Sequence, residues 1–135
     1  MRVYLSVPII ANRDLARAKA MAKAITDAGL ELSSPWVLEA TRGERASTLD
    51  VFRRDKEGVE SSDAIVADVS APSTGVGMEV MAAHYRGKRI VVVALRGSLV
   101  SRMLTHLEPK EVVEFEGNED LYLNLRRVLE TRPRA

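Results

Sequence analysis

Short apolar runs alternate with longer amphipathic segments along the whole chain. Runs rich in strand-forming residues occupy 3–7, 64–69, 89–95 and 112–115, and we expect each to form a strand. The run 64–69 lacks clean alternation of apolar and polar residues, which is typical of a strand covered on both faces. The pattern therefore predicts a sheet that lies between layers of helices.

The amphipathic segments between these runs predict helices. After Asn12, which we expect to be an N-cap, apolar residues recur at helical spacing from Leu15 to Ala28, and Gly29 ends this first helix. A second helix is expected to begin near Ser47 or Thr48, and further helices at 76–85 (ended by Gly87), 100–106 and 118–129. The interruption Ser33-Ser34-Pro35, with Trp36 just beyond it, predicts a short and irregular second strand within residues 30–38.

Strands and helices thus alternate along the chain, and residues 41–48 and 131–135 read as a polar loop and a frayed tail. The alternation predicts an α/β fold in one domain over residues 1–135: a flavodoxin-like, five-stranded parallel sheet of order 2-1-3-4-5 with helices on both faces. Ligands bind such sheets where the strand order reverses. We therefore expect a crevice between the first and third strands, walled by the loops after Val7 and Val69.

Composition narrows the class of protein. The net charge is +1 over 135 residues, with 46% hydrophobic and 29% charged residues, so no basic face for nucleic acid is implied. The absence of cysteine excludes disulfides, thiolate metal sites and cysteine nucleophiles. The start of the chain lacks the features of a signal peptide, and no apolar run approaches the roughly 20 residues of a membrane span. We expect a soluble, cytoplasmic protein that binds neither nucleic acid nor membranes.

Asp55 is the first candidate for chemistry. Val51, Asp55 and Val59 share one face of the second helix, and a carboxylate on a buried stripe is costly unless it is paired. The structural alternative is that Asp55 lies at the edge of the stripe, near water, or pairs with an arginine. We interpret its neighbours as a solvated face, comprising Arg53, Arg54, Lys56, Glu57 and Glu60.

Glu79 is the second candidate. It follows Gly75-Val76-Gly77, a sequence that suits a tight strand-to-helix turn and close approach of the backbone to a ligand. At a helix N-terminus the dipole would keep the carboxylate ionised and usable as a nucleophile. The alternative is a glutamate that serves only the electrostatics of a helix start.

Other polar residues give weaker signals. Ser70, Ser73 and Thr74 lie beside helix N–H groups and could cradle a phosphate, although ordinary turns have the same composition. Tyr4 lies within the first strand, where a tyrosine is usually a core residue with a wet hydroxyl, and Trp36 belongs to the core or covers the crevice. His84 and His106 are isolated, so we expect no metal site and no cofactor.

The spacing of these residues resembles a known family. The segments VYLSVP, D-x7-DAIVADVS-x-PS-x-GVG-x-E, GKRIVVVALRG and VSRML are similar to the 2'-deoxynucleoside 5'-phosphate N-hydrolases, which belong with the nucleoside 2-deoxyribosyltransferases. The similarity covers most of the chain and is densest from Asp55 to Met103. It implies a homodimeric N-glycosidase that cleaves a deoxynucleoside 5'-monophosphate to free base and 2-deoxyribose 5-phosphate.

The resemblance also implies residue roles. Glu79 matches the nucleophile that attacks the anomeric carbon, and Asp55 matches the second carboxylate, which assists departure of the base and handles the water proton. Tyr4 matches an active-site tyrosine. The implied substrate-binding residues are Ser73 for the 5'-phosphate, Gly75 and Gly77 beside it, Ser101 reaching the neighbouring subunit's site, and Ile9 and Arg13 in the loop after the first strand.

The loop after the first strand departs from the family pattern. The phosphate-binding members carry a Gly-Ser-Ile-Arg type of loop, whereas this chain has Val7-Pro8-Ile9-Ile10, and Arg13 is the nearest following arginine. This departure favours one rival function, a non-catalytic nucleotide-binding domain on the same scaffold. A second rival keeps the same chemistry: a transferase that passes deoxyribose to a second base. A phosphoacceptor receiver domain is disfavoured, because the first strand ends without acidic residues.

Overall fold

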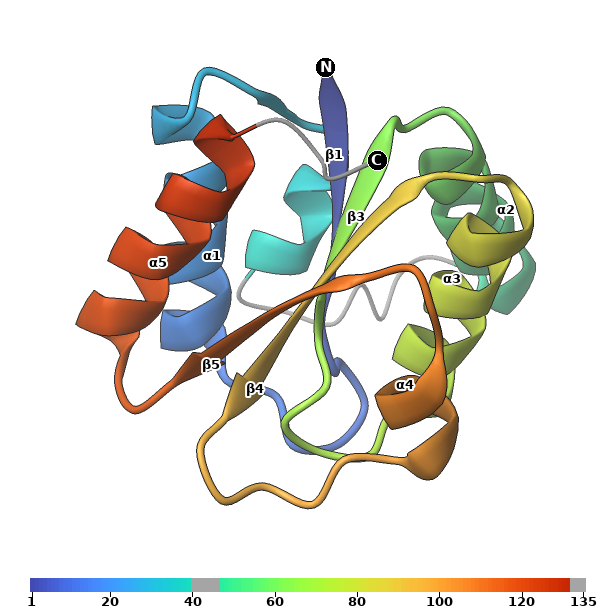
Figure 1. Cartoon of the computed structure of the whole chain (residues 1–135). Coiled ribbons are helices and arrows are strands. Elements are labelled where there is room, and N and C mark those ends of the chain that lie inside the picture. Colours follow the sequence, from blue (N-terminus) through green and yellow to red (C-terminus); the bar gives the residue numbers. More distant parts are fainter. Residues whose placement is uncertain (40–46, 132–135) are drawn as a thin grey trace.

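The computed structural model describes residues 1–39 and 47–131, and its elements follow the predicted order (Figure 1). The strands are β1 (Arg2–Ser6), β2 (Glu31–Leu32), β3 (Ala64–Asp68), β4 (Arg89–Leu95) and β5 (Glu111–Phe115). The helices are α1 (Leu15–Asp27), α2 (Thr48–Glu60), α3 (Thr74–Tyr85), α4 (Arg102–His106), α5 (Asn118–Glu130) and the short 3₁₀ helix η1 (Pro35–Leu38).

The five strands form one parallel sheet in the order β2-β1-β3-β4-β5. The predicted fold class is therefore confirmed. The chain builds outward from β1 to β2 and then crosses to the other side of β1 for β3, so the strand order reverses between β1 and β3. Loops and helices that follow these two strands diverge there, which opens a crevice at their carboxyl ends.

Alternate residues of the strands face two separate cores. Val3 and Leu5 of β1 pack in the cluster that includes α1 and α5, whereas Tyr4 packs in the cluster formed with α2 and α3. Figure 1 shows α1 and α5 on one side of the sheet and α2, α3 and α4 on the other. Since Tyr4 and Ser6 are two positions apart on β1, both hydroxyls project toward the layer that carries Asp55 and Glu79.

The beginning of α1 differs from the prediction. Its N-cap is Asp14, whose side chain accepts a hydrogen bond from the Arg17 N–H at 2.9 Å, so the expectation that Asn12 caps the helix is wrong. Asn12 instead adopts a left-handed conformation with φ of 61°, which asparagine tolerates better than most residues. Gly29, with φ of 81°, ends α1 as predicted.

The beginning of α3 also differs. Ser73 is the N-cap, and its hydroxyl accepts a hydrogen bond from the Val76 N–H at 3.3 Å. Gly75 and Gly77 therefore both lie inside the first turns of α3, which begins two residues before the predicted start at Val76, so the prediction of a turn through Gly75 is wrong. Two helical glycines cost about 1 kcal/mol each relative to alanine. Burial of Val76 and Val80 against the sheet, together with the Ser73 cap, outweighs that cost.

The remaining predictions need little change. The second strand is short, as expected, and η1 follows it with Trp36 in its first turn. Ser47 caps α2, accepting a hydrogen bond from the Asp50 N–H at 3.1 Å. Most of the predicted loop 41–48 and of the predicted tail 131–135 lies outside the described residues. Across 1–39 and 47–131, the structure contains no helix long and apolar enough to cross a membrane.

Candidate active site

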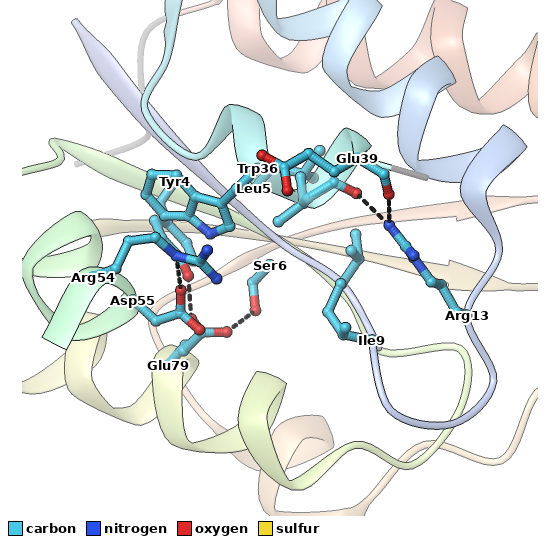
Figure 2. A pocket seen from close by; sticks show the side chains of 12 residues that line it. Tyr4, Leu5, Ser6, Ile9, Arg13, Trp36, Glu39, Arg54, Asp55 and Glu79 are labelled. Carbon is cyan, nitrogen blue, oxygen red and sulfur yellow. Dashed lines mark hydrogen bonds and ion pairs between the residues drawn. The ribbon is translucent and has the colours of Figure 1, made fainter. Parts of the chain in front are cut away.

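A hollow of about 50 Å³ lies at the carboxyl end of β1, in the predicted crevice. Figure 2 shows the side chains around it, which come from β1, the loop that follows, η1, α2 and α3. We call it the carboxylate pocket. Its lining residues are Tyr4, Leu5, Ser6, Val7, Ile9, Arg13, Trp36, Val37, Glu39, Arg54, Asp55 and Glu79.

Glu79 lies in the second turn of α3, and both of its carboxylate oxygens face β1. The Tyr4 hydroxyl donates a hydrogen bond to Oε2, and the Ser6 hydroxyl donates one to Oε1 at 2.8 Å. Two donors from alternate positions of one strand thus fix the orientation of the carboxylate. A side chain held in this way is suited to react at a defined position, because little ordering remains to be done when a substrate binds.

Burial raises the pKa of Glu79 to about 7, with a smaller contribution from the negative charge of Asp55. The hydrogen bonds from Tyr4 and Ser6 and the charge of Arg54 act in the opposite direction. The helix start does not dominate the electrostatics of Glu79, because Glu79 lies beyond the first turn and desolvation is the larger effect. Burial and the nearby Glu79 raise the pKa of Tyr4 as well, so the phenol remains a proton donor.

Asp55 enters the pocket from α2, as its position on the Val51–Val59 stripe predicted. Its side chain is 32% exposed and accepts a hydrogen bond from Arg54 Nε at 3.1 Å. Both structural alternatives for Asp55 thus hold: it lies near water at the edge of the stripe, and it pairs with an arginine. Neither removes it from the pocket, where its charge acts on both Glu79 and Tyr4.

Trp36 and Gly58 shape the wall between Tyr4 and α2. The Tyr4 and Trp36 rings meet edge to face, with centroids 6.2 Å apart and an interplanar angle of 62°. A Cβ on Gly58 would lie 2.7 Å from Tyr4 Cε2 and 3.3 Å from Trp36 Cη2. Only glycine at this position lets α2 approach both rings, a requirement that we did not anticipate from the sequence.

Ser6 and Arg54 are two further pocket residues that sequence reasoning missed. Ser6 could have been found from the strand period, since it lies two positions after Tyr4 and therefore faces the same layer. Arg54 was interpreted as part of a solvated helix face. Its guanidinium carbon instead lies 4.6 Å from the centroid of the Trp36 ring, and no periodicity in the sequence shows that contact.

Ile9 and Arg13 both line the carboxylate pocket, as predicted for substrate-binding positions. Arg13 donates hydrogen bonds from one terminal nitrogen to the carbonyl oxygens of Val37, at 3.3 Å, and Glu39. It thereby ties the loop after β1 to the end of η1. Ile10 is 88% exposed and is absent from the pocket lining.

A second, larger hollow of about 870 Å³ lies on the other side of α3. We call it the α3–α4 groove. It contains Ser73, Gly77 and Ser101 among mostly apolar residues of α3 and of the segment 99–107. Gly75 lines neither hollow, and a Cβ at Gly75 or Gly77 would meet no atom within 4 Å. The predicted site residues therefore fall into two groups separated by α3.

The described residues offer no cluster of three or more histidine, aspartate or glutamate side chains arranged to hold a metal ion. His84 contacts the Tyr85 ring, with centroids 5.5 Å apart, and His106 ends α4. The reactive groups around Glu79 are its own carboxylate, the Asp55 carboxylate, the Tyr4 phenol, the Ser6 hydroxyl and the Arg54 guanidinium, and Arg13 and Glu39 also line the pocket.

Comparison with known proteins agrees with this combination of fold and pocket. The model of the nucleoside 2-deoxyribosyltransferase family matches residues 3–119. A protein of Thermofilum pendens named "Putative 2'-deoxynucleoside 5'-phosphate N-hydrolase 1" is 36% identical over 106 residues, covering 75% of this chain and 73% of that protein. A relative of the same name from Methanosarcina mazei is 28% identical over 137 residues, covering 94% of this chain and 84% of the relative.

Solved structures give the same picture of the fold. A 2-deoxyribosyltransferase from Bacillus psychrosaccharolyticus superposes with a TM-score of 0.71 and 21% identity over 100% of both chains. The CMP N-glycosidase of Clostridium botulinum superposes with a TM-score of 0.69 and 16% identity, over 93% of this chain and 98% of that one. At these identities the likeness concerns the fold.

Proposed function

Because the chain belongs to the nucleoside 2-deoxyribosyltransferase family, we propose that it is an N-glycosidase acting on 2'-deoxynucleoside 5'-monophosphates. The products are the free base and 2-deoxyribose 5-phosphate. The names of the curated relatives support this substrate class. The observation that carries the proposal is the joint placement of Glu79 and Asp55 in one pocket, with two hydroxyl donors on Glu79.

The proposed reaction is a double displacement at the anomeric carbon. The Glu79 carboxylate attacks C1', the C1'–N bond breaks, and a glycosyl-enzyme ester forms. A water molecule then attacks C1', Asp55 takes its proton, and the ester bond breaks to regenerate the Glu79 carboxylate. Two carboxylates on one pocket suit a path through oxocarbenium-like transition states, which negative charge stabilises.

Tyr4 and Ser6 orient the nucleophile in this scheme. Their hydrogen bonds reach different oxygens of Glu79, and both bonds favour the ionised carboxylate against the desolvation that raises its pKa. The site thus balances two demands. Burial keeps the nucleophile poorly hydrated and reactive, and the two donors keep a useful fraction of it ionised near neutral pH.

The 5'-phosphate is proposed to bind at the N-terminus of α3. Ser73 caps that helix, whose first N–H groups favour an anion, and Gly75 and Gly77 present no side chain beside it. Ile9 and Arg13 form the opposite wall, at the end of β1. The positive charge of Arg13 adds to the attraction for a phosphate.

We also propose a homodimer in which Ser101 of a second copy completes the phosphate site. The family resemblance implies that Ser101 reaches the neighbouring subunit's site, and Ser101 lines the α3–α4 groove and not the carboxylate pocket. Exposed apolar side chains lie along the groove: Met78, Leu99 and Met103 are 63%, 93% and 69% exposed. Such a patch is typical of a surface that another protein covers.

Incubation with a panel of deoxynucleosides and their 5'-monophosphates, with chromatography of the free base, tests the proposed function. We expect base release from monophosphates, and no exchanged nucleotide when a second free base is added. Exchange into the second base would identify a transferase instead. Release from no member of the panel would contradict the N-glycosidase function itself.

A further inference from the structure

Arg54 is held at the carboxylate pocket by contacts on two sides. Its guanidinium carbon lies 4.6 Å from the centroid of the Trp36 indole, and its Nε donates to Asp55 Oδ1 at 3.1 Å. Adjacent residues on a helix do not normally face each other. The Arg54 side chain therefore folds back over the pocket to reach Asp55, where it could have extended into solvent. Figure 2 shows Arg54, Asp55 and Glu79 around one opening, with the Trp36 ring beside the guanidinium.

The place of the indole depends on a second feature of α2. Gly58 lies four positions after Arg54, on the same face of the helix. A Cβ there would lie 3.3 Å from Trp36 Cη2 and 2.7 Å from Tyr4 Cε2. The missing side chain at position 58 lets Trp36 pack against α2 at the level where Arg54 covers its face. The guanidinium thus rests in a built arrangement and not on an open surface.

Most of the N–H donors of Arg54 make no hydrogen bond to the described residues. A guanidinium carries five N–H donors, and within 1–39 and 47–131 only Nε makes a hydrogen bond, the one to Asp55. The side chain is 37% exposed, so both terminal amino groups can meet a ligand. Its charge reaches the reaction centre, because Arg54 is among the groups that lower the pKa of Glu79 and of Tyr4.

Departure of the base from an N-glycoside creates a demand that these donors meet. As the C1'–N bond breaks, its electron pair passes to the ring nitrogen, and negative charge spreads onto the acceptor atoms of the base. A fixed cation with free N–H donors stabilises that charge without giving up a proton. Arginine keeps its charge throughout the neutral range, which a carboxylic acid does not.

We propose that Arg54 is a catalytic residue of the N-glycosidase, and that its terminal amino groups donate hydrogen bonds to the departing base. This inference rests on the proposed function. It transfers one of the two roles that the family resemblance implies for Asp55, assistance to the departing base, to the neighbouring Arg54. Asp55 faces the pocket as a hydrogen-bond acceptor and keeps the other role, which is to take the proton of the attacking water.

Protons and electrons balance in this scheme. In the first step Glu79 forms its bond to C1' and the base leaves as an anion bound to Arg54. The anionic base then takes a proton from solvent. In the second step water attacks C1', Asp55 accepts one proton from it, and the electron pair of the ester bond returns to Glu79. Asp55 then releases its proton to solvent, which replaces the one taken up by the base.

The test uses monophosphates of 5-substituted deoxyuridines, whose electron-withdrawing substituents make the base a progressively better leaving group. In the Arg54→Ala variant, kcat/KM for the poorest leaving group should fall by about 10²–10³-fold, the cost of losing one preorganised donor to developing negative charge. The loss should shrink as the leaving group improves. Arg54→Lys should lie between Arg54→Ala and wild type, and added guanidinium ion should restore part of the activity of Arg54→Ala.

Two matched variants separate this role from a structural one. Arg53→Ala removes an exposed arginine beside Arg54 that lies outside the pocket, and it should leave kcat/KM within about twofold of wild type, as surface changes usually do. Asp55→Asn should lower kcat without changing the dependence of kcat/KM on the leaving group, because water attacks after the base has left.

A loss in Arg54→Ala that is the same for every leaving group would overturn the proposal, because it would indicate only a disturbed pocket. Unchanged kinetics in Arg54→Ala would overturn it too. Both outcomes require that wild type releases the base. If wild type releases no base from any member of the wider panel of monophosphates, the proposed N-glycosidase function has failed, and that result is seen before any variant is made.

Discussion

The Tyr4 hydroxyl donates a hydrogen bond to Glu79 Oε2, joining two residues that lie 75 positions apart in the chain. This bond connects the interior strand β1 to α3 at the point where the strand order reverses. It also couples the reactivity of Glu79 to the packing of the Tyr4 ring, which Trp36 and Gly58 hold in place. The geometry of the proposed nucleophile therefore depends on residues from β1, η1 and α2.

The pH dependence of the reaction should report the protonation of Glu79. Its pKa is raised to about 7, and attack requires the carboxylate, so kcat/KM should rise through pH 7 and be about a hundredfold lower at pH 5 than on the plateau. Tyr4→Phe removes a hydrogen bond that lowers the pKa and should move this limb to higher pH. Tyr85→Phe, which changes a tyrosine that is 81% exposed, should leave it in place.

A pH profile that is flat between pH 5 and 8 in wild type would contradict the assignment of Glu79 as the ionising nucleophile. A limb that stays in place in Tyr4→Phe would contradict the role of the Tyr4 hydroxyl.

The same burial should make ionised Glu79 lower the free energy of unfolding. The pKa of Glu79 is about 7 in the folded state against 4.5 for an unperturbed glutamate, so the folded state binds the proton more tightly. The associated stability is present below pH 4.5 and is lost as the pH rises through 7, by about 3 kcal/mol for a shift of this size. Glutamine does not ionise, so the Glu79→Gln variant does not lose this part of its stability as the pH rises. In thermal unfolding, the melting temperature of Glu79→Gln relative to that of wild type should increase from pH 4.5 to pH 8. A difference in melting temperature that stays constant over this range would contradict the desolvation of Glu79.

Gly58→Ala should damage both stability and activity. The new Cβ would lie 2.7 Å from Tyr4 Cε2, so the Tyr4 and Trp36 rings must move, at a cost typical of overpacking, about 1–3 kcal/mol. Chemical denaturation and kcat measure the two effects. Gly75→Ala is the control for stability, since its Cβ meets no atom within 4 Å inside a helix and should stabilise the fold slightly. Equal stability of Gly58→Ala and wild type would show that α2 can move away from the rings.

Met103→Glu should convert the proposed dimer to a monomer and raise KM for the monophosphate. Met103 is 69% exposed in the α3–α4 groove, so the substitution costs the folded monomer little but places a charge in an apolar interface. Light scattering gives the oligomeric state. Leu123→Glu is the matched control, because Leu123 is 58% exposed on α5, in the helical layer on the other side of the sheet. A wild-type monomer, or a dimer that Met103→Glu leaves intact, would exclude this interface.

The sheet could be predicted from the sequence because its signals are local. The apolar runs at 64–69 and 89–95 and the helical spacing from Leu15 to Ala28 each concern one element, and the alternating order then fixes a parallel sheet. Asp55 and Glu79 could be placed in one pocket because the strand order determines which helices meet at the reversal. The structure confirms that they line the same pocket; their catalytic roles stay a prediction.

What the sequence could not show depends on contacts between elements. Arg54 looks like any helix-surface arginine until Trp36 is placed against it. In the sequence, Gly58 is only a residue with low helix propensity. Its role depends on the Tyr4 ring, which lies against it in the structure. The raised pKa of Glu79 could not be predicted, because desolvation depends on the whole pocket, whereas the helix dipole can be inferred from sequence position alone.

Trapping the glycosyl-enzyme tests the central claim most directly. Asp55→Asn should slow the attack of water, so the ester on Glu79 should accumulate when this variant is mixed with substrate and quenched in acid. Mass spectrometry of the digested protein should then show a 2-deoxyribose 5-phosphate adduct on the peptide that contains Glu79, together with a burst of base equal to the enzyme concentration. Base release without an adduct on Glu79, or an adduct on another residue, would contradict the account.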